Sequence, residues 1–125
     1  QWMTWFTEAL ERHGGASKGA QALPPTMKEW FSGKTLGGFR GCAFLNGVSE
    51  IGPAMPAVVE VTRQHKLQMT DAIEALLPPS GLRRRTAEAL ATAVDGTIVQ
   101  AQYSGDPALA LRALQFTVDQ LNHKA

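Results

Sequence analysis

The sequence predicts an all-α domain of about six helices. Apolar residues recur at three- and four-residue steps over most of the chain, and clusters of glycine and proline divide it into segments of helical length. No alternation of apolar and polar residues is long enough to predict a sheet, and no internal repeat is visible. With 125 residues, 44% hydrophobic and 18% charged, the chain can bury a core of its own. We therefore expect residues 1–125 to form a single domain.

Short helices are expected in the first half of the chain. The first helix has apolar residues on one side and charged residues on the other, and Gly14-Gly15 ends it. The segment FRGCAFLNG, which holds the only cysteine, begins another helix that stops before Gly52-Pro53. The predicted helices span 2–13, 26–31 and 39–51, with loops over 14–25 and 32–38.

Longer helices are expected in the second half. The clearest spans 56–77, where apolar residues recur at helical spacing and a Pro-Pro pair ends the pattern. Another spans 82–103, and the last spans 107–122. The last helix begins with Asp106 as its N-cap and Pro107 at the first helical position, where the missing N–H leaves no hydrogen bond unmade.

The last two helices each carry a second line of small or apolar residues besides the line expected in the core. A helix that is apolar over so wide an arc must bury both sides or expose a patch that monomers avoid. Pairing with the same two helices of a second copy gives a four-helix interface with two-fold symmetry, so we expect a homodimer. A thick monomeric core is the alternative. The predicted interface residues are Ala89, Ala93, Gly96, Gln100, Leu109, Ala113, Phe116 and Gln120.

Composition and motifs argue against several classes of function. The net charge of +1 does not indicate a nucleic-acid surface, and Arg83–Arg85 is interpreted as a solvated face that pairs with Glu88. No membrane-spanning or signal segment is visible, and one cysteine cannot form an intramolecular disulfide. The expected location is therefore the cytoplasm. No phosphate loop, zinc motif or nucleophile elbow occurs, and the three histidines fall on different helices, so no metal or cofactor is predicted.

Two residues leave more than one interpretation open. His65 lies on the apolar side of its helix, so it is either a hydrogen-bonded core histidine or a ligand contact. Cys42, among apolar neighbours, is best interpreted as a small wall residue, although a nucleophilic pair with His65 remains an alternative. Large aromatic and sulfur-containing side chains with a few polar groups are also what an apolar pocket is made of. The candidate pocket residues are Trp5, Phe6, Met27, Trp30, Phe31, Phe39, Cys42, Ala43, Asn46, Glu50, Thr62, His65, Met69, Ile98 and Gln102.

Three segments in this order resemble the C-terminal ligand-binding and dimerisation domain of bacterial TetR-family transcriptional repressors. They are FRGCAFLNGVSEIG, PAVVEVTRQHKLQMTDAIEALL and AEALATAVDGTIVQAQYSGDPALALRALQFTVDQL. The resemblance rests on the Arg-Gly-Cys entry to the central helix, on Asp95-Gly96 within the penultimate helix and on the SGDP turn before the last helix.

The resemblance implies a sensor that binds a small apolar or aromatic effector among its middle helices and dimerises through its last two. The family's N-terminal helix-turn-helix is absent from this sequence, and residues 1–13 would correspond to the helix that connects it to the sensor. Operator DNA is therefore expected to bind only through that missing domain, with effector binding changing the spacing of the two DNA-binding units.

Two other functions stay open on the sequence. One is a small helical enzyme that uses Cys42 with His65 or Glu50. The other is a helical protein–protein interaction module without a pocket. We expect no enzymatic activity, because no side chain beside Cys42 other than Arg40 could activate the thiol.

Overall fold

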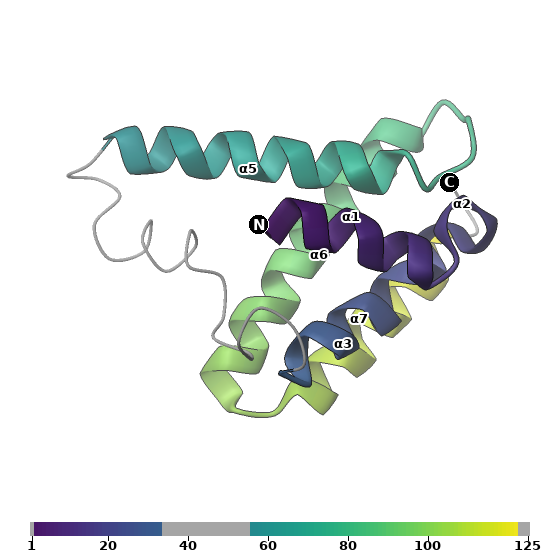
Figure 1. Ribbon diagram of the computed structural model, residues 1–125. Helices are drawn as coiled ribbons and strands as arrows, with labels where there is room; N and C mark the ends of the chain where they lie inside the picture. Colours follow the sequence, from purple (N-terminus) through teal and green to yellow (C-terminus); the bar gives the residue numbers. More distant parts are fainter. Residues whose placement is uncertain (1, 34–55, 123–125) are drawn as a thin grey trace.

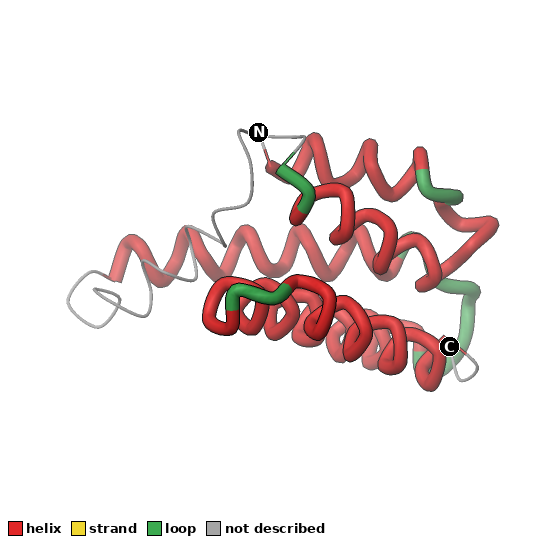
Figure 2. Tube along the Cα trace, turned by 90° about the horizontal axis from the view of Figure 1, so that it is seen from below, coloured by secondary structure: helices red, strands yellow, loops and turns green. Residues whose placement is uncertain are grey.

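The computed structural model describes residues 2–33 and 56–122, without the side chains of Pro56, Val58 and Asn122. Every regular element in these two ranges is helical, which confirms the predicted all-α class (Figures 1 and 2). The predicted helix over 39–51 lies outside the described residues. The elements are α1 (Trp2–Arg12), α2 (Gly15–Lys18), the 3-10 helix η1 (Gly19–Ala22), α3 (Leu23–Phe31), α5 (Pro56–Glu74), α6 (Arg83–Ser104) and α7 (Pro107–Asn122).

Helix α6 is the element around which the others are arranged. It packs against α5 on one side and against α7 on another, and α7 in turn packs against α3 and η1. Helix α1 lies against α3 and α5. Figure 1 shows that α6 runs down to the short turn and that α7 runs back up from it, so the two helices are roughly antiparallel. The largest fully buried side chains come from every long helix: Phe6, Leu23, Met27, Met69, Ile73, Leu90, Val94, Ile98, Leu114 and Val118.

The turn between α6 and α7 follows the sequence prediction. Gly105 adopts a left-handed conformation, with φ of 72°, and its N–H donates to the carbonyl of Ala101 at 3.0 Å. Asp106 then caps α7, because its Oδ1 accepts a hydrogen bond from the N–H of Ala108 at 3.1 Å. These two residues end one helix and begin the next within a single short connection, which keeps α6 and α7 adjacent.

The predicted loop over 14–25 is wrong. This stretch forms α2 and η1, and α3 begins at Leu23 rather than at residue 26. Pro24 and Pro25 lie in the first turn of α3, where helical N–H groups have no partner within the helix, so two prolines do not interrupt it. Gly14, with φ of 119°, makes the sharp turn after α1; a Cβ there would lie 2.1 Å from the Lys18 Cγ.

Helix α5 ends three residues before its predicted end. The N–H groups of Leu76 and Leu77 bond to the carbonyls of Ile73 and Glu74, three residues back, so the chain tightens before the Pro-Pro pair. The predicted apolar stripe holds for Met69 and Ile73, which are fully buried, but Val61 is 52% exposed.

We expect Leu90→Ala to lower the free energy of unfolding by about 2–5 kcal/mol, because Leu90 is fully buried in the centre of α6 and its truncation leaves a cavity. Leu67→Ala is the matched control, since Leu67 lies on α5 and is 45% exposed. Urea denaturation followed by circular dichroism measures both variants. Equal losses in the two variants would contradict the assignment of α6 as the central helix.

Candidate functional site

An aromatic cluster joins α1, α3 and α5. The first turns of α1 place Trp2, Trp5 and Phe6 on one side, as their spacing requires. The Trp2 ring stacks on Phe6 with centroids 4.7 Å apart and meets the edge of Trp30, from α3, at 6.1 Å. It also lies 5.9 Å from the Trp5 ring and 5.4 Å from the imidazole of His65, on α5. The sequence contains three tryptophans, and all three belong to this cluster.

His65 is the titratable member of the aromatic cluster. Burial lowers the pKa of its imidazole from 6.5 to about 4, and the neighbouring Lys66 charge acts in the same direction. The imidazole is therefore neutral at pH 7. A neutral imidazole has one nitrogen that donates a hydrogen bond and one that accepts. Such a group can orient a small ligand that has a hydroxyl, carbonyl or amide group.

Lys66 and Asp95 connect α5 to α6 beside the cluster. The Lys66 Nζ lies 2.9 Å from Oδ1 of Asp95, and the two side chains are only 20% and 25% exposed. Removing one partner would leave the other charge without its counter-ion at a position that is largely shielded from water. The Asp95 noted in the sequence therefore has a structural role within the chain.

Glu29 joins the far end of α1 to α3. One carboxylate oxygen accepts from the guanidinium of Arg12 and the other lies 2.8 Å from Nε2 of His13. Hydrogen bonding with His13, and then the contact with Arg12, lowers the pKa of the Glu29 carboxyl. Helix α1 is thus attached to α3 by aromatic rings near one end and by an ionic contact at the other.

The three adjacent arginines do not form an open cationic patch. Arg84 Nη1 lies 2.8 Å from Asp71 and 2.7 Å from Glu74, both at the end of α5. The predicted local contact with Glu88 is present at 3.7 Å. The Nε of Arg83 donates to the carbonyl of Glu74 at 3.0 Å. Arg84 therefore ties the start of α6 to α5.

The structure gathers most of the predicted pocket residues that it describes. Phe6, Met27, Trp30, Phe31, Met69 and Ile98 belong to one hydrophobic cluster, and Trp5 packs against it. Thr62 is buried on α5, one turn before His65, whereas Gln102 is exposed on α6. These residues thus form a continuous apolar body with His65 at its edge. Phe39, Cys42, Ala43, Asn46 and Glu50 lie outside the described residues.

The residues predicted for the dimer interface all lie at least partly in solvent. Ala89, Gly96, Leu109, Ala113, Phe116 and Gln120 are exposed, and Ala93 and Gln100 are partly exposed. Phe116 is 66% exposed and Leu109 41%. The sequence interpretation missed Val99 and Tyr103, which are 49% and 89% exposed on α6. Their positions three and seven residues after Gly96 could have placed them with it on one side of the helix.

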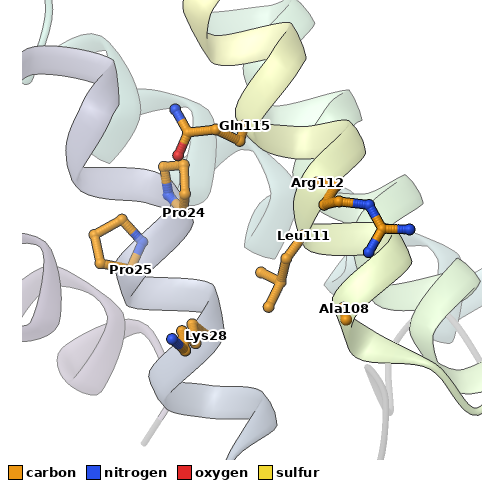
Figure 3. Close-up of a pocket in the computed structure, with 7 residues that line it drawn as sticks. All are labelled: Pro24, Pro25, Lys28, Ala108, Leu111, Arg112 and Gln115. Atoms are coloured by element: carbon orange, nitrogen blue, oxygen red, sulfur yellow. The ribbon is translucent and has the colours of Figure 1, made fainter.

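A groove that the sequence did not indicate lies between α3 and α7 (Figure 3). Its volume is about 450 Å³. Leu111 points from α7 toward α3, between the two helices (Figure 3). The lining residues are Pro24, Pro25, Lys28, Ala108, Leu111, Arg112 and Gln115. Contacts between segments so far apart in the chain leave no periodic signal in a single sequence.

Other kinds of site find no support in the part of the chain that the structure describes. There, no three His, Cys, Asp or Glu side chains are grouped so that they could hold a metal ion. None of the described helices combines the length and the apolar character needed to cross a membrane. Comparison with known proteins gives no match to a family model, to a curated protein or to a solved structure.

His65→Leu should reduce the loss of stability in acid. The unfolded chain takes up a proton on His65 below about pH 6.5, whereas the folded chain resists protonation down to about pH 4. The free energy of unfolding of the unmodified chain therefore falls across this interval, by up to about 3 kcal/mol from this group. Urea denaturation between pH 4 and 8 measures the effect.

The carboxylates titrate in both proteins, so the difference between the two pH curves isolates His65. Curves that stay parallel from pH 8 to pH 4 would contradict a neutral, partly buried imidazole at this position.

Proposed function

We propose that this chain is the effector-binding and dimerisation part of a bacterial TetR-like transcriptional regulator. The observation that carries the proposal is the outward face of α6 and α7. Both helices bury one side in the core, yet they leave Val99, Tyr103, Leu109 and Phe116 at least 41% exposed. A group of exposed apolar side chains on one surface often marks an interaction site, whereas single exposed apolar side chains are common on any protein. The partner proposed for this face is a second copy of the chain.

Gly96 supports close approach of another helix. A glycine in the middle of a helix costs about 1 kcal/mol relative to alanine. Gly96 is not among the glycines with positive φ, and a Cβ added there meets nothing within 4 Å. No contact among the described residues therefore requires a glycine at this position. A second copy would explain the glycine if one of its helices crosses α6 at Gly96, because the absent side chain lets the two backbones come close.

The effector is proposed to bind at the aromatic cluster. Binding sites for small molecules combine an apolar lining with a few polar groups that fix orientation. The rings of Trp2, Trp5 and Trp30 offer the apolar lining. The neutral imidazole of His65 offers a polar group that can fix the orientation of a ligand. An apolar or aromatic molecule with one or two hydrogen-bonding groups fits this chemistry. Neither a metal nor a cofactor enters the proposal.

Regulation follows from a shift between two arrangements of the dimer. An effector that binds one arrangement better than the other shifts the equilibrium by its difference in affinity, and about 1–3 kcal/mol is typical. Helix α1 is suited to transmit the change, because Trp2 contacts both α3 and α5. Operator DNA is proposed to bind through a separate helix-turn-helix domain connected to α1.

Phe116→Glu should convert the dimer into a folded monomer. Phe116 is 66% exposed within one chain, so the charge does not disturb the core, but it would enter the proposed interface. Loss of a central aromatic contact costs about 2 kcal/mol or more, which raises the dimer dissociation constant about 30-fold. Sedimentation equilibrium at micromolar concentration measures it.

Leu67→Glu is the control, because Leu67 is 45% exposed on α5, away from the proposed interface. Gly96→Leu should weaken the dimer as Phe116→Glu does. A monomeric unmodified chain, or variants that dimerise like it, would refute the second copy as the occupant of this face.

An effector should be detectable by tryptophan fluorescence, because the three tryptophans all lie in the aromatic cluster. A screen of small aromatic and apolar amphiphiles by thermal shift is expected to yield stabilising compounds that also change this fluorescence. A ligand at 100 times its dissociation constant adds about 2.7 kcal/mol to the free energy of unfolding. His65→Leu should lower the affinity about tenfold at pH 7 while the melting temperature of the free protein changes little.

A large drop in melting temperature with unchanged affinity would instead make His65 a core residue. A broad screen without any stabilising compound would favour the pocketless interaction module.

A further inference from the structure

The ion pair between Lys66 and Asp95 is more shielded from water than the arginine pairs that also join helices. Its two side chains are 20% and 25% exposed, whereas Arg12 and Arg84 are 49% and 41% exposed. The Oδ1 of Asp95, which lies 2.9 Å from the Lys66 Nζ, is itself buried. Water therefore does little to solvate this oxygen, and the lysine charge compensates it instead.

Each partner of this pair is next in sequence to a residue of a proposed site. Lys66 comes directly after His65, whose imidazole lies 5.4 Å from the Trp2 ring in the aromatic cluster. The lysine charge acts on that imidazole, because it contributes to the lowered pKa of His65. Asp95 comes directly before Gly96, which is exposed on the proposed dimer face of α6. The pair therefore connects the turn of α5 that carries His65 to the turn of α6 that carries Gly96.

A shielded ion pair fixes the position of one helix on another more sharply than apolar contacts do. Opposite charges attract more strongly where water is excluded, and each is poorly stabilised there without the other. Apolar burial is non-directional and depends mainly on the area removed from water. A displacement of α5 at Lys66 is therefore expected to move α6 at Asp95. Shifts of about 1–2 Å between packed helices are typical of regulatory transitions.

We propose that Lys66 and Asp95 couple the aromatic cluster to the dimer interface, so that a ligand at the cluster and a second copy at Gly96 affect each other's binding. This inference rests on the proposed function and adds the residues through which its two sites communicate. Both are positioning residues, because they act through their neighbours His65 and Gly96. Coupling of this kind is reciprocal, so dimer formation should itself alter the aromatic cluster.

The reciprocal effect can be measured without an effector. The three tryptophans of the chain all lie in the aromatic cluster, and none is among the predicted interface residues. The full chain is diluted at pH 7 through the concentrations at which sedimentation shows the dimer dissociating, and tryptophan emission is recorded with selective excitation. The expected result is a change in emission with the same midpoint as dissociation. Phe116→Glu, the proposed monomer, should show the emission of the dilute chain at every concentration.

A double variant tests the pair itself. Lys66→Met combined with Asp95→Leu removes both charges, a replacement that is often neutral for stability. This variant should still dimerise but lose the change in emission, whereas Lys66→Arg, which keeps the positive charge, should retain it. Arg84→Met is the matched control, because it removes a different contact between α5 and α6, the one with Asp71 and Glu74. It should also retain the change.

A dimer that forms without a change in tryptophan emission would overturn the inference, and so would a double variant that dimerises with the full change. Loss of the change in Arg84→Met as well would also overturn it, because the coupling would then belong to the whole contact between α5 and α6. If the double variant does not fold or dimerise, Asp95→Asn decides the question, since it keeps the size of the side chain and removes its charge.

An undiminished change in Asp95→Asn would count against the pair in the same way. A chain that is monomeric at every concentration would refute the proposed function and this inference with it. The other outcomes refute the inference alone, so the two failures can be told apart.

Discussion

The fold depends on the double contact that α6 makes with α5 and α7. A single helix can pack against two others only if its buried arc is wide. The buried small residues Ala87, Ala91 and Ala101 let the neighbouring helices approach α6 closely. Leu90 fills the space between these small residues. Once this arc is buried, none of the described residues covers the remaining face of α6. The outward exposure of Val99 and Tyr103 is a consequence of the same packing.

Several ion pairs of the described residues connect one helix to another. Glu29 fastens α1 to α3, Lys66 with Asp95 fastens α5 to α6, and Arg84 fastens the start of α6 to the end of α5. Each contact crosses from one helix to another, so each specifies how two elements meet. Ion pairs at a surface contribute little to stability, about 0–1 kcal/mol. Their contribution here is to the relative placement of helices whose apolar faces alone would tolerate sliding.

The sequence predicted the long helices well, because several turns of periodic residues define each of them and because Asp106 and Gly105 mark an unambiguous boundary. It failed over 14–25, where α2 and η1 are too short to show a period. Val61 shows a related limit: it fits the helical spacing of buried residues, yet its side chain is 52% exposed.

The candidate site was predictable only in part. Aromatic residues within one turn of α1 must share a face, so a cluster could be anticipated, but its closure by His65 depends on how α5 crosses α1. The groove depends on α3 meeting α7, two helices that are more than 70 positions apart in the sequence. Nothing in the spacing of either segment encodes that meeting. The exposed face of α6 and α7 was predictable because each helix is apolar over more than one side.

The two attachments of α1 to α3 have a mechanical consequence. Rings hold one end of α1 and the Glu29 carboxylate holds the other, so α1 cannot pivot on α3 about either point alone. A displacement of α3 is therefore expected to carry α1 with it, because both attachments connect the same two helices. Since the Trp2 ring also contacts His65, such a displacement is expected to reach α5 as well.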